Sequence, residues 1–258
     1  MAKLTNQVAL VTGASGEIGH AICRQLAAEG ASLILHCHHR PERAQSLLHS
    51  LGQNRTHPYQ HHIVLQADLT QENEVKQLVK RGADHFERLD ILINNAGWTR
   101  VVKAENLDEL DESLIEKTLR LKIHAPIYLI RAARPYLESS GQGQVINITS
   151  VAGIAARGSS IIYSAANAAL SNLTRSLARA LAPKIRINAV APGFVETGFA
   201  WPKDGQVKAH VAQRNHIGRT IEAEEVANVV RFLVCDAPAI TGEEIAIDGG
   251  IARLGARA

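Results

Sequence analysis

The chain has 258 residues, of which 46% are hydrophobic and 21% charged, and its formal net charge is +3. This composition is ordinary for a soluble globular domain, and the charge is too small to indicate a nucleic-acid or membrane partner. No apolar run is long enough to span a bilayer, and no secretory signal is visible. Cys23, Cys37 and Cys235 are far apart and odd in number, which favours free thiols in a reducing compartment. We therefore expect a cytoplasmic protein.

Short apolar runs alternate with amphipathic stretches along the chain, and no repeat or linker divides it. The expected strands are 8–11, 32–36, 62–66, 91–94, 144–149, 186–190 and 244–247. The expected helices are 18–29, 41–51, 71–86, 108–137, 162–181 and 222–234. This alternation predicts the α/β class, with a Rossmann-type doubly wound parallel sheet in a single domain. Residues 198–217 break the rhythm, and we expect them to form a mobile lid over a substrate.

A glycine-containing turn, TGASGEIG from Thr12 to Gly19, joins the first expected strand to the first helix. Backbone N–H groups of such a turn can approach a pyrophosphate at the positive end of the helix. A glycine turn alone is weak evidence, because any tight strand–helix turn can contain one. Its place after the first strand and before an amphipathic helix favours dinucleotide binding.

The second expected strand ends in His36-Cys37-His38-His39-Arg40, without an acidic residue. In this fold an acid at that position accepts hydrogen bonds from the ribose 2′-hydroxyl and selects NAD. Arg40 and the histidines can instead pair with a 2′-phosphate, which favours NADP(H) over NAD(H). The alternative is a solvated basic loop. No histidine cluster has zinc-like spacing, so no metal site is expected.

Four further segments follow in order: Ala67-Asp68-Leu69, Asn94-Asn95-Ala96-Gly97, Pro192-Gly193-Phe194-Val195-Glu196-Thr197 and Asp248-Gly249-Gly250. Together with the glycine turn, they resemble the short-chain dehydrogenase/reductase family over almost the whole chain. Glu17 stands where the family's TGxxxGxG turn has its middle glycine, and its carboxylate could crowd or repel the diphosphate. The resemblance implies these cofactor-binding residues: Gly13, Ser15, Ile18, His38, His39, Asp68, Leu69, Asn95, Ala96, Gly97, Tyr163, Pro192, Gly193, Val195 and Thr197.

The family's usual catalytic residues are an Asn, a Ser, and the Tyr and Lys of a YxxxK motif. By resemblance, Ser150 and Tyr163 occupy the Ser and Tyr positions and carry general acid–base chemistry beside a hydride carrier. Asn167 stands at the Lys position, and counting back from Pro135 places Lys122 at the Asn position. The amine and the amide of the catalytic tetrad are therefore exchanged in this chain.

Two interpretations of the exchange stay open. In the first, Lys122 reaches the same pocket, where a cation within ~4–6 Å favours an ionised phenol, and Asn167 hydrogen-bonds the ribose. The protein is then an oxidoreductase that transfers a hydride between NADP(H) and a carbonyl/alcohol substrate. In the second, the chemistry is altered or lost, as in a dinucleotide sensor or the partner subunit of an active homologue.

The resemblance also suggests partners for this chain. Family members pair through the two long helices expected here at 108–137 and 162–181, so a homodimer or homotetramer is expected. The remaining partner is a small-molecule substrate. Phe194, Phe199 and Trp201 would give its pocket an apolar wall, which favours a hydrophobic or ring portion.

Overall fold

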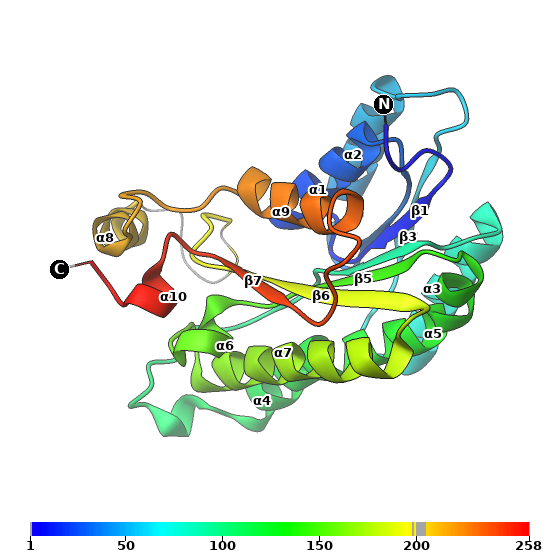
Figure 1. Ribbon diagram of the computed structural model, residues 1–258. Coiled ribbons are helices and arrows are strands. Elements are labelled where there is room, and N and C mark those ends of the chain that lie inside the picture. The colour runs from blue at the N-terminus through cyan, green and yellow to red at the C-terminus, as the bar shows by residue number, and fades with distance from the viewer. Residues whose placement is uncertain (1, 198, 200–204, 258) are drawn as a thin grey trace.

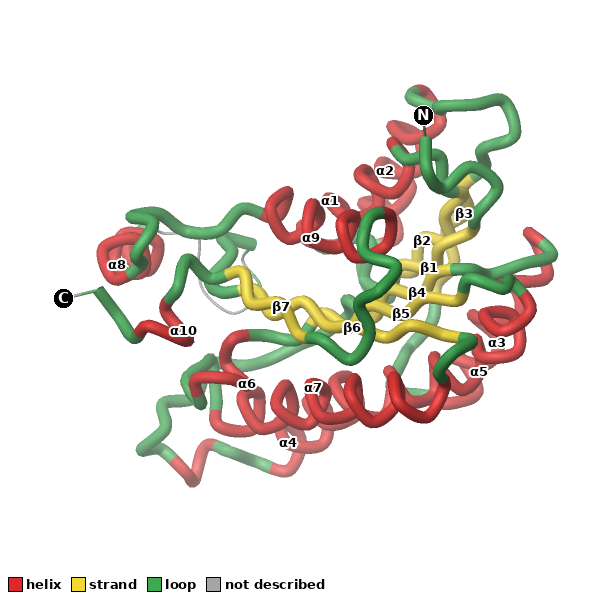
Figure 2. The backbone as a smooth tube through the Cα atoms, viewed as in Figure 1, coloured by secondary structure: helices red, strands yellow, loops and turns green. Residues whose placement is uncertain are grey.

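The structure is a computed structural model that describes residues 2–197, 199 and 205–257. In these residues seven parallel strands form one sheet in the order β3-β2-β1-β4-β5-β6-β7 (Figures 1 and 2). The strands are β1 Val8–Val11, β2 Ser32–Cys37, β3 His62–Gln66, β4 Ile91–Asn94, β5 Gly143–Ile148, β6 Ile185–Pro192 and β7 Glu244–Ile247. The predicted α/β, Rossmann-type single domain is confirmed.

Helices cover both faces of the sheet: α1, α2 and α9 lie on one face, and α3, α4, α5 and α7 on the other (Figure 1). The longer helices are α1 Glu17–Ala28, α2 Pro41–Gln53, α3 Glu72–Phe86, α4 Glu112–Leu119, α5 Ala125–Ser139, α7 Ile161–Leu181, α8 Gln206–Arg214 and α9 Ala223–Cys235. Two short helices, α6 Val151–Ala155 and α10 Ile251–Leu254, were not predicted. No helix within the described residues is both long and apolar enough to cross a bilayer.

The strands are buried on both faces, as a covered parallel sheet requires. Ala9 and Val11 of β1 pack into the core beneath α1 and α9, whereas Val8 and Leu10 pack into the core on the opposite face. Successive side chains of a strand point to opposite faces, so one short apolar run supplies both cores. The sheet is thereby held between two helical layers.

The single helix expected over 108–137 is interrupted in the structure. A 3-10 turn occupies Leu107–Glu109, and a π-helical turn, Arg120–His124, separates α4 from α5. Pro126 follows this π turn and has no N–H to donate to the Lys122 carbonyl. The missing i+4 hydrogen bond favours the wider turn, a feature frequent at functional sites.

That residues 198–217 form a mobile lid stays a prediction, but the segment contains a helix that was not predicted. Gln206–Arg214 forms helix α8, whose Ala, Gln, Lys and Arg residues are strong helix formers. Residues 198 and 200–204, and with them Trp201, lie outside the described residues. Helix α8 buries none of its residues and lies beyond the β7 edge of the sheet (Figure 1).

Candidate active site

A cleft of about 680 Å³ opens at the carboxyl ends of the strands. From β1 the sheet continues to β2 and β3 on one side and to β4 and β5 on the other. A crevice for ligands forms at the point where the strand order reverses in this way. The cleft is lined by these predicted cofactor residues: Gly13, Ser15, Ile18, His38, His39, Leu69, Asn95, Ala96, Gly97, Tyr163, Pro192, Gly193, Val195 and Thr197. Asp68 is the predicted cofactor residue that does not line it.

The glycine turn depends on two of its glycines. Gly13 has a φ of +66°, and a Cβ on Gly19 would lie 2.3 Å from the Gly13 carbonyl oxygen. Gly16 has a φ of −82° and serves as the N-cap of α1, so its backbone conformation does not require glycine. Glu17 then occupies the first turn of α1 and lines the cleft. The backbones of Gly13 and Gly19 therefore remain in close contact although Glu17 carries a carboxylate.

His36 ties the glycine turn to the next strand end. The Gly13 N–H donates to His36 Nδ1 at 3.1 Å, which leaves the other ring nitrogen to donate to the Ala67 carbonyl at 3.0 Å. Burial lowers the pKa of His36 to about 4. A neutral imidazole therefore links Gly13 to Ala67, in the segment after β3. Sequence reasoning missed this role of His36.

The end of β2 carries positive groups into the cleft. His38, His39, Arg40 and Arg43 all line it, and the rings of the two histidines stack with centroids 3.6 Å apart. Arg43 was not predicted; it lies in the first turn of α2, three residues after the N-cap residue Arg40. The basic end of the cleft thus includes a residue of α2 in addition to the residues that follow β2.

Asp68 has a local role in the structure. Its Oδ1 accepts hydrogen bonds from the Thr70 N–H at 2.9 Å and from the Thr70 hydroxyl at 2.8 Å. These bonds hold the turn that leads into α3, whereas the adjacent Leu69 faces the cleft. The contact of Asp68 with the cofactor stays a prediction.

Ser150 and Tyr163 come from two consecutive helix starts. Ser150 is the N-cap of α6, where its Oγ accepts from the Ala152 N–H at 3.2 Å. Tyr163 lies in the first turn of α7, with its N–H donating to the capping Ser160 at 3.2 Å. Burial raises the pKa of Tyr163, and the Ser150 and Asn167 side chains beside the phenol partly offset this rise.

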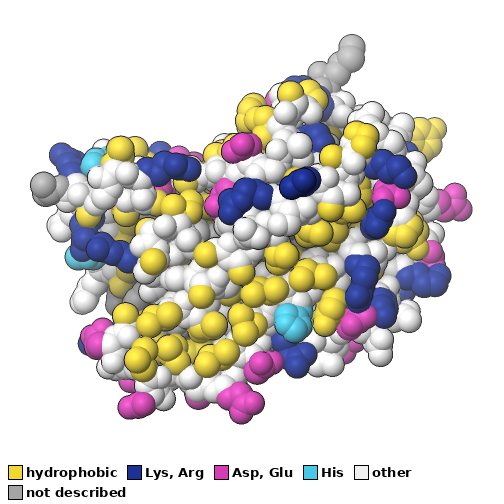
Figure 3. All heavy atoms as spheres, turned by 60° about the horizontal axis from the view of Figure 1, so that its bottom comes forward, with side chains coloured by type: hydrophobic (Ala, Val, Ile, Leu, Met, Phe, Trp, Pro, Cys, Tyr) yellow, Lys and Arg dark blue, Asp and Glu magenta, His cyan; other side chains and the backbone are white. Residues whose placement is uncertain are grey.

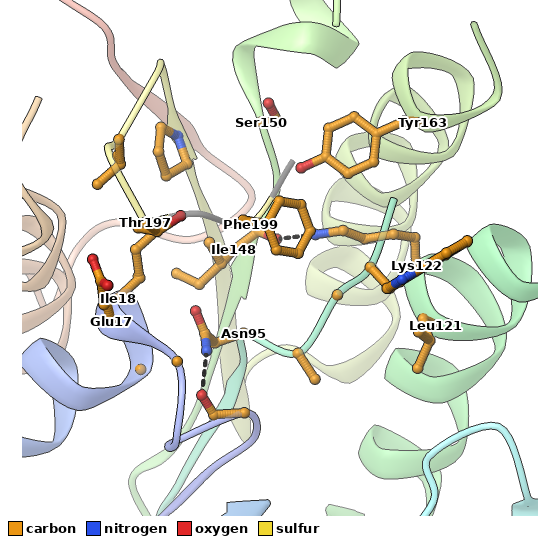
Figure 4. A pocket seen from close by; sticks show the side chains of 18 of the residues that line it. Glu17, Ile18, Asn95, Leu121, Lys122, Ile148, Ser150, Tyr163, Thr197 and Phe199 are labelled. Carbon is orange, nitrogen blue, oxygen red and sulfur yellow. Dashed lines mark hydrogen bonds between the residues drawn. The ribbon is translucent and has the colours of Figure 1, made fainter. Parts of the chain in front are cut away.

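Lys122 lies in the π turn, and its side chain enters the cleft. It is 4% exposed, and its Nζ donates to the Ile148 carbonyl at 3.0 Å. The Nζ lies 5.8 Å from the centre of the Tyr163 ring, and Figure 4 shows the side chain extending from its helix toward the tyrosine. Burial lowers the pKa of Lys122 to about 8. A buried amine that titrates near neutral pH thus stands beside the phenol.

Gly97 provides the space for this amine. A Cβ at position 97 would lie 3.0 Å from Lys122 Cε and 3.3 Å from its Nζ. Gly97 ends the segment Asn94 to Gly97, which Thr12 holds in place by accepting the Asn95 and Ala96 N–H groups at 2.9 and 3.0 Å. The motif therefore shapes the cleft wall that Lys122 crosses.

Asn167 does not reach the cleft. It is fully buried in α7, its Nδ2 donates to the Tyr163 carbonyl of its own helix at 2.8 Å, and its Oδ1 has no partner among the described residues. The amide is too short to extend past Tyr163 as a lysine would. The structure therefore brings Ser150, Tyr163 and Lys122 together on the cleft and leaves Asn167 behind the tyrosine.

Comparison with known proteins agrees with this architecture. A family model described as enoyl-(acyl carrier protein) reductase, one of the short-chain alcohol dehydrogenase type, matches residues 13–252. The chain belongs to the short-chain dehydrogenase/reductase family. The match includes the glycine turn, the Ser150–Tyr163 region and the Asp248-Gly249-Gly250 segment. The family predicted from the motifs is confirmed.

Family members of known description cover the chain almost completely. The cis-4-hydroxycyclohexanecarboxylate dehydrogenase of Sinomonas cyclohexanicum is 35% identical over 95% of this chain and 96% of that protein. The 3-oxoacyl-[acyl-carrier-protein] reductase of Synechocystis sp. is 34% identical over 97% and 99%. A short-chain dehydrogenase of Burkholderia cenocepacia, solved in complex with NADP, superposes with a TM-score of 0.85 at 34% identity over 96% and 98%.

Two further cleft residues were missed because nothing in their sequence context distinguishes them. Lys117 on α4 and Arg157 between α6 and α7 line the cleft, yet each reads as an ordinary surface cation in the sequence. Within the described residues, no three His, Cys, Asp or Glu side chains are grouped so that they could hold a metal ion.

Proposed function

We propose that this protein is an NADP(H)-dependent oxidoreductase that interconverts a carbonyl group and an alcohol, with Lys122 as the amine that assists Tyr163. The observation that carries the proposal is the buried Lys122 Nζ, 5.8 Å from the Tyr163 ring centre and on the same cleft as Ser150. Membership of an oxidoreductase family supports the reaction class. The amine of the usual motif is thus supplied by the neighbouring helix.

The residues present fit a dinucleotide. The positive φ of Gly13 and the close approach at Gly19 leave backbone N–H groups near the N-terminus of α1, where a diphosphate is stabilised. On the opposite wall, a Cβ at Gly193 would lie 2.8 Å from the Asp248 Cβ, so this segment also needs glycine for its close packing. The cleft between them runs from the glycine turn to Tyr163.

The preference for NADP(H) over NAD(H) follows from charge. His38, His39, Arg40 and Arg43 line the end of the cleft that follows β2, where the adenosine ribose of a dinucleotide lies in this fold. Guanidinium groups bind phosphate with paired, charge-assisted hydrogen bonds. The NADP complex of the Burkholderia cenocepacia relative supports the same assignment for this chain.

When bound, NADPH supplies a hydride to the carbonyl carbon of the substrate. The Ser150 hydroxyl and the Tyr163 phenol both face the place where the carbonyl oxygen would lie, and Tyr163 donates the proton that completes the alcohol. Burial alone raises the pKa of Tyr163, which makes the phenolate left after proton donation costly. A nearby positive charge is needed to stabilise that phenolate.

Lys122 provides that charge. Its ammonium group lies on the cleft side of the Tyr163 ring and is held by the Ile148 carbonyl. Because burial lowers the pKa of Lys122 to about 8, the amine is mostly protonated at neutral pH and loses its charge in mildly alkaline solution.

A binding and turnover assay tests the proposal. The purified protein is titrated with NADPH and NADH by fluorescence and then mixed with 4-oxocyclohexanecarboxylate, the ketone of the substrate type named for the Sinomonas relative. We expect tighter binding of NADPH than of NADH, and NADPH consumption that depends on the ketone. Absence of binding at millimolar dinucleotide would overturn the proposal, and binding without turnover of several ketones would favour the sensor or partner-subunit alternative.

The expected homodimer or homotetramer has structural support but stays a prediction. Ile161, Ala165 and Ala168 are exposed along one side of α7. Figure 3 shows hydrophobic side chains gathered on the face of the molecule that carries α4 and α7. The cytoplasmic location also stays a prediction, based on the three free cysteines.

A further inference from the structure

Besides Lys122, and Arg40 and Arg43 at the basic end, two cations of the cleft have no carboxylate partner among the described residues. Lys117 and Arg157 form no ion pair or hydrogen bond with an acidic side chain in the part of the chain that the structure describes. The Lys117 Nζ lies 4.1 Å from the centre of the Trp98 ring, a cation–π contact that fixes it against the cleft wall. A cation that is placed by an aromatic ring, rather than neutralised by an acid, keeps its charge available to a ligand.

Hydrogen bonds join the segments that carry these two cations into one rim. The Thr99 and Ser159 hydroxyls are 2.7 Å apart, and the Val102 N–H donates to the Ser159 carbonyl at 2.7 Å. Trp98, which Lys117 covers, directly precedes Thr99, and Arg157 lies two residues before Ser159. The rim therefore presents Lys117 from α4 and Arg157 from the α6–α7 connection at the same end of the cleft.

The acidic groups of the cleft lie elsewhere. Among its described lining residues the carboxylates are Glu17, at the glycine turn, and Glu196, which pairs with Lys208 at 2.7 Å. Figure 4 shows Glu17 on the opposite side of the cleft from Tyr163 and Lys122. The described lining residues at the Tyr163 end therefore carry positive charge only, and a cleft with charge of one sign concentrates ligands of the other sign.

Apolar side chains also line the cleft. Leu121 and Val151 are among them, and the Phe199 ring lies 6.2 Å from the Tyr163 ring, centre to centre. An apolar pocket with a few placed polar groups is the usual form of a small-molecule site. The pocket beside Tyr163 is therefore built for an apolar portion that ends in a negative group.

We propose that the substrate is a carbonyl compound that carries a carboxylate, with an apolar, ring-sized portion between the two groups. The carbonyl lies at Tyr163 and Ser150, and the carboxylate is held by Lys117 and Arg157 through charge-assisted hydrogen bonds. This assignment rests on the proposed oxidoreductase function for the carbonyl end. The assignment of a carboxylate at the other end of the substrate is based on Lys117 and Arg157.

The test compares two probes of equal shape, 4-oxocyclohexanecarboxylate and its neutral carboxamide. Each is reduced with NADPH by the wild-type protein and by the Lys117→Gln and Arg157→Gln variants. We expect each variant to lower kcat/KM for the carboxylate about tenfold, the loss of one charged hydrogen bond, and to leave the carboxamide within about twofold. Lys117→Arg and Arg157→Lys, which keep the charge, should retain the carboxylate preference.

Lys103→Gln is the matched control, because this exposed lysine lies outside the cleft. It should leave kcat/KM for both probes unchanged. Equal kcat/KM for the two probes in the wild-type protein, or equal losses for both in the variants, overturns the substrate assignment while leaving the oxidoreductase function intact.

A binding measurement separates this inference from the proposed function. The NADP⁺-loaded protein is titrated calorimetrically with cyclohexanecarboxylate and cyclohexanecarboxamide, neither of which has a carbonyl to reduce at the ring. Selective binding of the carboxylate that both Gln variants abolish supports the anion site even if no ketone is turned over. Equal binding of the two compounds overturns it.

Discussion

The Lys122 amine lies 5.8 Å from the centre of the Tyr163 ring, although the two residues belong to different helices. The Ile148 carbonyl, from the end of β5, accepts a hydrogen bond from this amine, with an N···O distance of 3.0 Å. Strand β5 also leads into Ser150. The π turn that positions Lys122, the strand that holds it and the serine that faces it are thus directly connected in the fold.

Replacing Gly97 with Ala should displace the amine and lower activity. A methyl group there would lie 3.0 Å from Lys122 Cε and 3.3 Å from its Nζ. Contacts of this length move the flexible end of the lysine by a few tenths of an ångström, less than the ~1 Å displacement that costs on the order of 10²-fold in rate, so kcat should fall by less than about tenfold. The affinity for NADPH is measured separately, because Gly97 also lines the cleft. Gly52→Ala, with nothing within 4 Å of its Cβ, is the control. An unchanged kcat for Gly97→Ala would show that the position of Lys122 is unimportant.

Lys122→Met should stabilise the fold. Burial lowers the pKa of Lys122 from 10.5 to about 8, so the buried charge disfavours folding in neutral solution. A shift of this size, less one lost hydrogen bond, predicts a free energy of unfolding higher by about 2 kcal/mol near neutral pH. Because the folded-state pKa is depressed, the wild-type penalty is complete below about pH 8 and decreases as the pH rises from there toward 10.5. Urea unfolding of both proteins at neutral and alkaline pH checks this. A gain in stability that does not shrink with rising pH would contradict the buried-charge explanation.

The imidazole of His36 should make the fold sensitive to acid. Its pKa falls from 6.5 to about 4 on folding, so its contribution to stability is complete above pH 6.5 and is lost as the pH falls toward 4. The pKa of His62 is also lowered to about 4 by burial, so the two residues share this loss. The variant His36→Leu should be destabilised by about 1–3 kcal/mol near neutral pH, because the Gly13 N–H loses its acceptor. Its stability should then fall about half as steeply with acid as that of the wild type. Equal pH slopes for the two proteins would exclude a neutral His36 as the link.

The sequence was sufficient to predict the sheet, because buried parallel strands have short apolar runs that stand out between amphipathic helices. It could not predict the π turn, which depends on Pro126 removing one hydrogen bond inside an otherwise helical pattern. The helix at 206–214 was also not predicted from the sequence. Helix α8 buries none of its residues, so its sequence has no apolar periodicity.

For the site, motif matching placed Ser150, Tyr163 and Lys122 on one cleft, and the structure agrees. Asn167 does not line the cleft, because its short amide donates to its own helix, and its contact with the ribose stays a prediction. Lys117 and Arg157 were missed because they lie on segments distant in the sequence, which are joined by contacts such as that between Thr99 and Ser159. Such contacts between distant segments leave no local signal in the sequence.

The basic end of the cleft should determine cofactor choice. Arg40→Gln and Arg43→Gln should each weaken NADPH binding about tenfold, which is the contribution of one charged hydrogen bond, and leave NADH binding nearly unchanged. Fluorescence titration with both dinucleotides measures this, with Arg55→Gln as the control for an exposed arginine outside the cleft. Parallel weakening of NADPH and NADH would mean that these side chains do not read the 2′-phosphate.

The role of Lys122 is tested most directly by its alanine variant. NADPH-dependent ketone reduction is measured for Lys122→Ala and Tyr163→Phe, with Lys103→Ala as a surface control. If Lys122 supplies the charge that Tyr163 needs, both cleft variants lose kcat by similar factors, on the order of 10²–10⁴, while the control keeps wild-type turnover. Near-normal kcat for Lys122→Ala, alongside an inactive Tyr163→Phe, would contradict the assignment of Lys122 as the catalytic amine.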